Sequence, residues 1–313
     1  MKPEPLPPLP GNLPSLAPTP EPARGVISWN MNTTCNYRCS YCTQRFLDDR
    51  GRWARDVPRF LEAFARLPGR WEIKLSGGEP FVHPDFLVVV RGLRELGFLI
   101  SVVTNFSASQ ETLLGFLEAA GDQLGVMSCS LHLEYVDTEE ALERFITHAR
   151  FVKERLPRGA SLCVTCVATE TNLLRLSALK ERMASAGLTF KVQPEKQGRD
   201  VVAYSEGQLA QLVQLGGHNL TGYVAPDFGG RPCWSGARYF ILDDRGNAYR
   251  CYPARRYRTE SLGNMLDGTF RLREAATPCL YRYCNCTVPI SRGMMPTEGA
   301  QDAVRRARAE DDA

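Results

Sequence analysis

The sequence predicts an α/β fold: a partial (βα)6 barrel of the TIM type, followed by a small C-terminal part built on a β-hairpin. Two observations lead to this prediction. Strand-like and helix-like segments alternate six times between residues 26 and 215, which implies a parallel sheet. Along the predicted strands, one face is apolar and would lie under the helices, whereas the other is polar and would face a wet cavity.

The spacing of the apolar residues predicts each strand and helix in turn. The predicted strands are Val26–Met31, Trp71–Leu75, Ile100–Thr104, Val126–Leu131, Ser161–Val167 and Thr189–Gln193. The predicted helices lie near Pro58–Arg66, Pro84–Glu95, Gln110–Ala119, Thr138–Arg155, Leu173–Ser185 and Glu206–Leu215. The choice between an open doubly wound sheet and a barrel depends on the side chains of these strands.

Residues two apart in a strand share a face, and one face of the six strands is mostly polar. It carries Ser28, Asn30, Glu72, Lys74, Ser101, Val103, Ser128, Ser130, Cys163, Thr165, Lys191 and Gln193. A doubly wound sheet would bury both faces and be apolar on both. The polar face therefore favours a barrel with a substrate chamber. We expect one cavity to receive Glu72, Lys74, Ser128, His132, Lys191 and Gln193.

Length and composition exclude several classes of protein. The 313 residues suffice for one large domain with a small appendage, or for two modest domains. The net charge is only +3, without a basic block, which argues against nucleic acid binding. No apolar run reaches membrane-spanning length, and the N-terminus lacks the apolar core of a signal peptide, so we expect a cytoplasmic protein with no membrane partner.

The chain divides into four predicted regions. Residues 1–23 are proline-rich and are expected to be extended or disordered, and the charged, alanine-rich residues 297–313 are expected to form a frayed tail. The barrel spans 24–215 and the cysteine-rich C-terminal domain spans 216–296. In a reducing compartment, the eleven cysteines are expected to be metal ligands or redox groups rather than disulfides.

Three cysteines follow the first predicted strand, in C-N-Y-R-C-S-Y-C over residues 35–42. A 4Fe-4S cluster takes one thiolate per iron, so Cys35, Cys39 and Cys42 would leave its fourth iron open to a substrate or cofactor. The alternative is a zinc knuckle that lacks its fourth ligand. The nearest histidine, His83, lies beyond the next strand, which disfavours zinc.

This C-x-x-x-C-x-x-C loop resembles that of the radical S-adenosylmethionine (SAM) superfamily. Ser76-Gly77-Gly78-Glu79-Pro80 at the end of the second strand is similar to the G-G-E-P motif of that family, whose backbone receives the amino group of SAM. Thr104-Asn105 is similar to its T-N-G motif, although Phe106 replaces the glycine. The resemblance covers about residues 24–200. It implies cofactor-binding roles for Tyr41, Gly77, Gly78, Glu79, Pro80, Thr104, Asn105 and Ser130.

The resemblance also implies the chemistry. SAM would chelate the open iron, and one electron from the cluster would cleave SAM to methionine and a 5′-deoxyadenosyl radical, which takes a hydrogen atom from the substrate. The cofactor supplies the reactive species, while the barrel orients the substrate and excludes water. A flavodoxin or a ferredoxin-type protein is the expected electron donor.

Five further cysteines lie beyond residue 230. The segments Tyr239–Leu242 and Asn247–Arg250, joined by a turn containing Gly246, predict a β-hairpin, with Cys233 ahead of it and Cys251 at its end. This arrangement resembles the auxiliary-cluster extension called SPASM, or its shorter form, Twitch. It implies a second 4Fe-4S cluster on Cys233, Cys251 and two of Cys279, Cys284 and Cys286. A structural zinc site with four thiolate ligands is the alternative.

Three residues of the predicted barrel are candidates for catalytic roles. Cys163 falls on the polar face and is either a packed core residue or a hydrogen-atom donor, as an epimerase would need. Lys191 and Glu195 are candidate acid-base residues, or simply charges at the barrel rim. The other two cysteines of the barrel, Cys129 and Cys166, fall on the apolar face and are expected to pack in the core.

Three functions compete. The first is an oxidoreductase acting on a carbohydrate-like small molecule, with epimerisation as a variant, and the polar lumen favours it. The second is a maturase that cross-links or otherwise modifies a ribosomally made peptide. The third is a non-enzymatic iron-sulfur or zinc protein. For a carbohydrate-like substrate, an electron-accepting auxiliary cluster favours oxidation over epimerisation.

Overall fold

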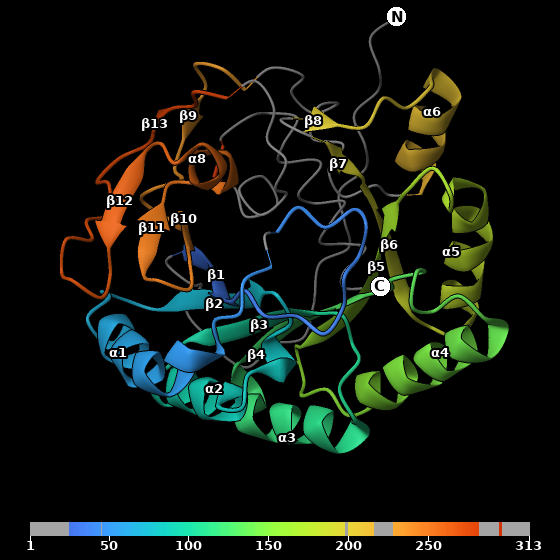
Figure 1. Ribbon diagram of the computed structural model, residues 1–313, viewed down its shortest axis with the longest axis horizontal. Coiled ribbons are helices and arrows are strands. Elements are labelled where there is room, and N and C mark those ends of the chain that lie inside the picture. Colours follow the sequence, from blue (N-terminus) through green and yellow to red (C-terminus); the bar gives the residue numbers. More distant parts are fainter. Residues whose placement is uncertain (1–24, 45, 198–199, 216–227, 282–293, 296–313) are drawn as a thin grey trace, which may run out of the picture.

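A strongly curved sheet with helices along its outer side forms the body of the molecule (Figure 1). The computed structural model describes residues 25–44, 46–197, 200–215, 228–281 and 294–295. The main sheet has nine strands in the order β12-β11-β10-β1-β2-β3-β4-β5-β6, and the neighbours from β1 to β6 are parallel. Because the ladder ends at β12 and at β6, the sheet is an open, partial barrel.

Six βα units make up the barrel. Its strands are β1 (Gly25–Asn32), β2 (Trp71–Gly77), β3 (Leu99–Thr104), β4 (Leu124–Ser130), β5 (Ser161–Ala168) and β6 (Thr189–Pro194). Its helices are α1 (Trp53–Ala65), α2 (Phe86–Glu95), α3 (Gln110–Ala120), α4 (Glu139–Lys153), α5 (Leu176–Ser185) and α6 (Glu206–Gln214). Short 3-10 helices are η1 (Arg50–Arg52), η2 (Pro80–Val82), η3 (Gly121–Gln123) and η4 (Leu173–Arg175).

The remaining elements follow the barrel. They are β7 (Lys196–Gln197), β8 (Asp200–Val201), β9 (Pro232–Cys233), β10 (Tyr239–Leu242), β11 (Asn247–Tyr249), α8 (Tyr252–Tyr257), β12 (Ser261–Asn264) and β13 (Thr277–Pro278). The partial barrel predicted from the sequence is confirmed. One helix begins earlier than predicted: α1 starts at Trp53 rather than at Pro58, because Trp53 and Val57 are themselves buried on its inner face.

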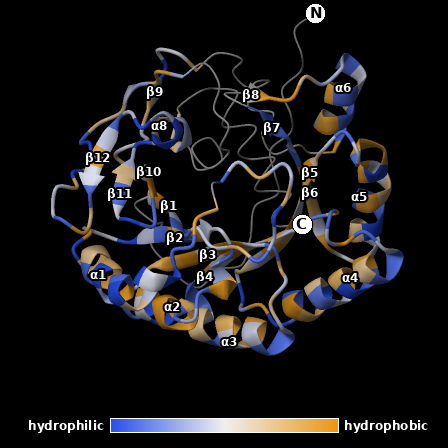
Figure 2. Ribbon diagram, in the orientation of Figure 1, coloured by the Kyte–Doolittle hydropathy of each residue, from blue (hydrophilic) through white to orange (hydrophobic). Residues whose placement is uncertain are grey.

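The main hydrophobic core lies between the sheet and the outer helices. Figure 2 shows hydrophobic and hydrophilic residues interspersed along helices α1 to α5, as amphipathic helices require. The apolar strand face contributes Ile27, Trp29, Ile73, Val102 and Val164, each almost completely buried. On the same strands, the residues that alternate with these apolar ones lie on the opposite face of the sheet, which is the cavity side. The alternation read from the sequence therefore distinguishes the packed side of the sheet from its cavity side.

The C-terminal hairpin continues the barrel sheet. Strand β10 pairs in parallel with β1, with Val26 opposite Tyr239 and Trp29 opposite Leu242, and β11 and β12 follow as antiparallel strands. All four residues of β10 are buried. Tyr239 and Ile241 face a second apolar cluster, whereas Phe240 packs on Trp71 with ring centroids 5.7 Å apart. The hairpin thus has apolar residues on both faces because it is an inner strand pair of the larger sheet.

Parts of the predicted organisation lie outside the described residues. These are the N-terminal region 1–24, the segments 216–227 and 282–293, and the tail from 296 on. In the part that the structure describes, no helix is long and apolar enough to span a membrane.

Candidate functional site

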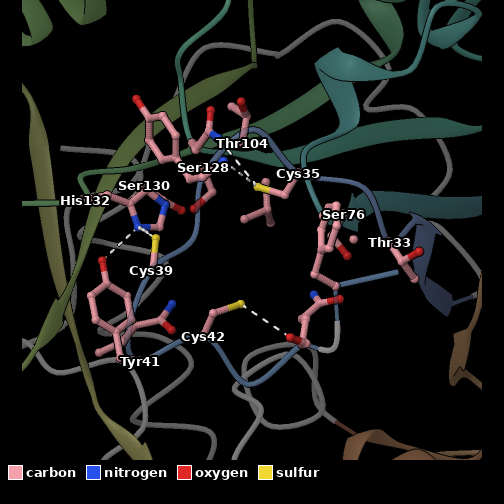
Figure 3. Close-up of a pocket in the computed structure, with 18 of the residues that line it drawn as sticks. Thr33, Cys35, Cys39, Tyr41, Cys42, Ser76, Thr104, Ser128, Ser130 and His132 are labelled. Carbon is pink, nitrogen blue, oxygen red and sulfur yellow. Dashed lines mark hydrogen bonds between the residues drawn. The ribbon is translucent and has the colours of Figure 1, made fainter. Parts of the chain in front are cut away.

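One cavity of about 440 Å³ lies on the inner side of the curved sheet. The loop after β1, the ends of β2 and β3 and the polar face of the strands line it, together with Lys196 of β7 and Tyr252 of α8. Figure 3 shows Cys35, Cys39 and Cys42 around the same open space, with Ser76, Thr104, Ser128 and Ser130 on the strand side. The structure thus brings together the three-cysteine loop and the polar strand face.

Asp49 fixes the base of the cysteine loop. Its carboxylate accepts hydrogen bonds from the backbone N–H of Thr33 at 2.8 Å and of Thr34 at 3.1 Å, and from the Thr34 hydroxyl at 2.6 Å. Burial would raise the pKa of Asp49, but the hydrogen bonds from Thr34 and Thr33 outweigh it and hold the pKa below its ordinary value. Asp49 therefore stays ionised and anchors the chain immediately before Cys35.

The segment after β4 holds the middle of the loop. His132 Nδ1 lies 3.2 Å from Cys39 Sγ and 2.8 Å from the Tyr41 hydroxyl. The Glu134 carboxylate accepts hydrogen bonds from the backbone N–H and the hydroxyl of Ser40. Tyr135 stacks on Tyr37, with ring centroids 3.8 Å apart. These contacts give the loop a defined shape although it contains neither helix nor strand.

The positions of the three thiols around one cavity fit a cluster, and bound iron would displace the thiol protons that burial favours. All three cysteines are free and line the cavity, Cys35 and Cys39 half-buried and Cys42 exposed. Burial raises the pKa of Cys35, and it raises that of Cys39 to about 11. Among the described residues, no three His, Cys, Asp or Glu side chains converge on a single metal ion. A 4Fe-4S cluster, in contrast, takes one thiolate on each iron, so its ligands stand apart around it.

Gly77 and Gly78 sit where the end of β2 meets the root of the loop. A Cβ on Gly77 would lie 2.3 Å from the Asn32 carbonyl oxygen, and one on Gly78 would lie 2.0 Å from that of Thr34. Gly77 also has a φ of +136°. Close approach of a ligand is therefore one reason for glycine here, and the neighbouring backbone, which passes too closely for a side chain, is another.

Glu79 braces the site from behind. Its buried carboxylate accepts hydrogen bonds from Thr104 Oγ1 at 2.7 Å, Asn105 N at 2.6 Å and Phe81 N at 3.1 Å. Burial raises the pKa of Glu79 to about 7, although these hydrogen bonds pull it down. Neither Glu79 nor Pro80 lines the cavity. Glu79 instead connects the end of β2 to the end of β3 through its hydrogen bonds with Thr104 and Asn105.

The segment after β3 explains how Phe106 replaces a glycine. Phe106 has a φ of 60°, the left-handed conformation that glycine adopts most readily. Its buried ring packs on Phe145 and His148, with centroid distances of 5.4 and 4.8 Å. This packing holds the unusual backbone, and Asn105 keeps its position: its Nδ2 donates to Asn36 Oδ1 at 2.8 Å.

The polar strand face is only partly exposed to the cavity. Of the six residues expected there, Lys74, Ser128, His132 and Gln193 line it, and Glu72 and Lys191 do not. Both of these are buried. Tyr41, Gly77, Gly78, Thr104, Asn105 and Ser130 also line the cavity, and the cofactor-binding roles that the family resemblance implies for them stay a prediction.

The candidate catalytic residues lie elsewhere. Cys163 is on the predicted face, opposite Ser128 in the neighbouring strand, but it is buried and does not line the cavity. Lys191 and Glu195 do not line it either. Strand parity gave the face of Cys163 and Lys191 correctly, but it does not show how deeply a side chain is covered.

The C-terminal cysteines form a second group. Cys233 and Cys251 are buried in one apolar cluster, and the half-buried Cys279 packs against it. Cys233 ends β9, whose partner strand β13 immediately precedes Cys279. Cys251 is the residue before α8. Cys284 and Cys286 lie outside the described residues, so the full ligand set stays a prediction.

Arg250 ties this second group together. Its guanidinium is almost fully buried and donates to the carbonyl oxygens of Ser235, Thr277 and Pro278 at 3.1, 2.7 and 2.8 Å. It also forms an ion pair with Glu260 at 2.7 Å. Thr277 pairs with Cys233 and precedes Cys279 by two residues, so one side chain links all three cysteine-bearing segments.

Sequence reasoning missed several of these residues. They are Asp49, Glu134, Tyr135, Lys196 and Arg250. Each acts through a partner that is distant in the sequence or through backbone atoms. Arg250, which directly precedes Cys251, carried the one signal that could have been used: a charged residue in the predicted hairpin between two cysteines.

Comparisons with known proteins bear on the site. Residues 29–181 match the model of the radical SAM superfamily. The chain is 32% identical over 108 residues to the probable GTP 3′,8-cyclase of Thermococcus kodakarensis, covering 34% of this chain and 35% of that protein. It is 26% identical over 172 residues to the tungsten-containing aldehyde ferredoxin oxidoreductase cofactor-modifying protein of Pyrococcus furiosus, covering 50% and 48%.

Among solved structures, Streptococcus suis SuiB bound to its precursor peptide SuiA has a similar fold. The TM-score is 0.52 at 14% identity, covering 79% of this chain and 64% of SuiB. At this identity the likeness concerns the fold. The match spans 35% of the Thermococcus protein, 48% of the Pyrococcus protein and 64% of SuiB, so it covers less than two thirds of each of them.

Proposed function

Residues 29–181 match the model of the radical SAM superfamily, and we propose that the chain belongs to this superfamily and that Cys35, Cys39 and Cys42 hold the 4Fe-4S cluster of a SAM-cleaving enzyme. When bound, the cluster and SAM supply a 5′-deoxyadenosyl radical that abstracts a hydrogen atom from a substrate. The protein has to place the substrate carbon next to this radical and keep water away from both.

One observation carries the proposal: the three thiols and the polar strand face line the same cavity. Asp49 and the segment His132–Tyr135 hold the loop from two sides. Gly77 and Gly78 border the cavity directly, and Glu79 fixes them relative to Asn105. The chain thereby presents its cofactor-binding positions on one side of a space whose other side can contact a substrate.

For the substrate, we propose a polar, carbohydrate-like small molecule that is oxidised. Serine hydroxyls and an amide line the strand side of the cavity, namely Ser28, Ser76, Ser128, Ser130 and Gln193. These groups donate and accept hydrogen bonds, as a sugar hydroxyl requires. The name of the Thermococcus relative points to a nucleotide, which contains a sugar.

Oxidation removes a hydrogen atom, a proton and one further electron from the substrate. A second cluster on the C-terminal cysteines would supply the electron acceptor. Epimerisation needs a hydrogen-atom donor in the cavity instead, and the candidate donor, Cys163, does not line it. The geometry therefore supports oxidation better than epimerisation.

A peptide is the second candidate substrate. The observation that favours it is the fold that this chain shares with SuiB in its complex with a precursor peptide. A peptide maturase would use the same cavity for the side chain that loses its hydrogen atom.

The test begins with anaerobically reconstituted protein, dithionite and SAM. We expect release of 5′-deoxyadenosine, measured by chromatography and mass spectrometry, and no release would contradict the proposed chemistry. Candidate sugars and nucleotides carrying deuterium on carbon are then compared with deuterated precursor peptides. Deuterium transfer into 5′-deoxyadenosine from the small molecules supports the first substrate class, and transfer only from peptides supports the second.

Oxidation and epimerisation are separated with the substrate that donates deuterium. Turnover of the unlabelled compound in deuterated water should give an oxidised product. A product with the molecular formula of the substrate, except for one deuterium at the abstraction site, would establish epimerisation instead.

A further inference from the structure

The charges on the cavity wall are all of one sign. Arg38, Lys74 and Lys196 are the charged residues of the lining, and no aspartate or glutamate of the described residues belongs to it. The fourth basic residue of the lining is His132, whose Nδ1 lies 2.8 Å from the Tyr41 hydroxyl. The described part of the wall therefore carries positively charged side chains and neither aspartate nor glutamate.

Two of the three cations are engaged with the protein. The Arg38 guanidinium lies 3.4 Å from the centroid of the Phe46 ring and donates to the carbonyl oxygens of Cys35 and Tyr37. The Lys196 ammonium lies 5.8 Å from the centroid of the Tyr252 ring. Both residues belong to loop or edge segments at the border of the cavity.

Lys74 differs from both. It lies on β2, inside the sheet, and is half-buried, with Ser28 as its register partner on β1 and Ser101 on β3. Within the part of the chain that the structure describes, its ammonium makes no hydrogen bond or ion pair. The carboxylate nearest in sequence on the same strand face, Glu72, is buried and accepts a hydrogen bond from the Ser101 hydroxyl at 2.8 Å.

A half-buried ammonium without a partner among the described residues is suited to bind an anion from outside the protein. Partly removing a charge from water is unfavourable unless an opposite charge or hydrogen-bond acceptors replace the water. The hydroxyl of Ser28, which also lines the cavity, is the polar group on the adjacent strand at the same level. Lysine and a neighbouring hydroxyl together form a simple receptor for phosphate or carboxylate oxygens.

Lys74 also stands apart from the cofactor-binding end of β2. It precedes Gly77 by three residues, which corresponds to about 10 Å along a strand. It thus lies deeper along the wall than the glycines that border the cysteine loop. An anion held there would be a part of the substrate.

Building on the proposed function, we propose that the substrate carries an anionic group, a phosphate or a carboxylate, and that Lys74 receives it. This assigns Lys74 a substrate-binding role and narrows the substrate class from polar molecules to anionic ones. The neutral side chains on the rest of the wall would contact the uncharged part of the molecule.

The test compares charged probes with their neutral counterparts on reconstituted holoenzyme containing SAM. GTP against guanosine tests the phosphate source, and glucuronate against glucose tests the carboxylate source. Isothermal titration calorimetry should show, in at least one pair, about tenfold or tighter binding of the charged member. The pair that shows it identifies the source, and equal affinities within both pairs would overturn the proposal.

Variants connect the preference to the residue. Lys74→Met should remove the preference for the charged probe, and Lys74→Arg should keep most of it, because the positive charge remains. Lys153→Met on α4, an exposed lysine away from the cavity, is the matched control and should behave like the wild type. A preference that survives in a folded Lys74→Met protein would also overturn the proposal.

Two further measurements keep the outcomes distinct. Weakened SAM binding in Lys74→Met, with unchanged discrimination between probes, would assign the residue to the cofactor and contradict the proposal. Release of 5′-deoxyadenosine by the wild type, measured in parallel, tests the SAM-cleaving function independently. Release of 5′-deoxyadenosine without a preference for anionic probes would contradict only the substrate assignment. The absence of 5′-deoxyadenosine release would contradict the proposed function itself.

Discussion

The cysteines near residue 40 and those beyond residue 230 are held in opposite ways. Cys35, Cys39 and Cys42 lie on an irregular loop that lines an open cavity, and Cys42 is exposed. Cys233 and Cys251 are buried among apolar side chains, and Cys279 packs against them. The first group is fixed by several contacts spread along its loop, from Asp49, His132 and Glu134, and the second by one buried guanidinium, that of Arg250.

This difference suits two different tasks. A group that must receive a cofactor and a substrate needs open space, so its supports lie behind the loop, as Asp49 and Glu79 do. The second cluster that we propose on the C-terminal cysteines would only transfer electrons, and burial would keep water and other ligands away from it. Each prediction below tests a part of this contrast.

The largest effect is expected from Cys35→Ala, Cys39→Ala and Cys42→Ala combined. The triple variant should lose 5′-deoxyadenosine release completely, because no thiolate remains for the first cluster. Its iron content should fall from about eight to about four per chain, the second cluster being retained. Iron analysis with circular dichroism checks this, and SAM cleavage by the folded variant would disprove the assignment of the loop. Stoichiometric zinc alongside about four irons in the wild type would replace the second cluster by a zinc site.

Arg250→Met should affect the other group selectively. Loss of the guanidinium leaves Glu260 with Arg273 as its ion-pair partner and removes the donor from three carbonyl oxygens, so we expect the free energy of unfolding to fall by about 3 kcal/mol. The variant should also lose the iron of the second cluster while the spectroscopic signal of the first persists. Urea unfolding and electron paramagnetic resonance measure the two effects.

A surface ion pair provides the control for Arg250. Arg182 on α5 pairs with Glu139 and Glu143 of α4 in solvent, and Arg182→Met should change stability little and iron content not at all. Equal losses in the two arginine variants would contradict a special role for Arg250.

The two regions should respond to pH with opposite sign. Burial raises the pKa of Glu79 from 4.5 to about 7, so between these values the native state binds more protons than the unfolded state. Its contribution to stability is full below about pH 4.5 and declines by up to about 3 kcal/mol as the pH rises through 7. In Glu79→Gln this decline should disappear, as measured by urea unfolding of the metal-free protein at several pH values.

Glu260 behaves in the reverse manner. Burial would raise its pKa, but the hydrogen bonds from Arg250 and its other partners lower it below 4.5. Its contribution is therefore present above pH 4.5 and is lost as the pH falls through the lowered pKa. Glu260→Gln should remove this acid sensitivity and leave the decline between pH 4.5 and 7 intact. The same pH profile in both glutamine variants would refute the contrast.

The smallest effect is expected from Cys163→Ala. Cys163 is buried and does not line the cavity, so the variant should keep SAM cleavage and most product formation, at a modest cost in stability. Product analysis after turnover in deuterated water checks this. Deuterium at the abstraction site that vanishes in the variant would restore Cys163 as the hydrogen-atom donor.

The sequence by itself determined the six βα units, the apolar side of the sheet and the three-cysteine loop. These features depend on local periodicity and on spacing within about ten residues, where strand and helix geometry fixes which side chains are neighbours. The alternation of Ser28, Lys74 and Ser128 with apolar residues was sufficient to predict a polar chamber, and these three residues line it. The family motifs around Cys35 and Gly77 were visible for the same reason.

Only the tertiary structure decided how deep each side chain lies and which distant residues support the site. Lys74 and Lys191 share a strand face by parity, yet Lys74 lines the cavity whereas Lys191 is buried and does not. Asp49 and Arg250 act on backbone groups of other segments, which leave no pattern in side-chain chemistry. The pairing of β10 with β1, more than 200 residues apart, likewise follows from the burial of both faces of a short apolar strand, which no local period encodes.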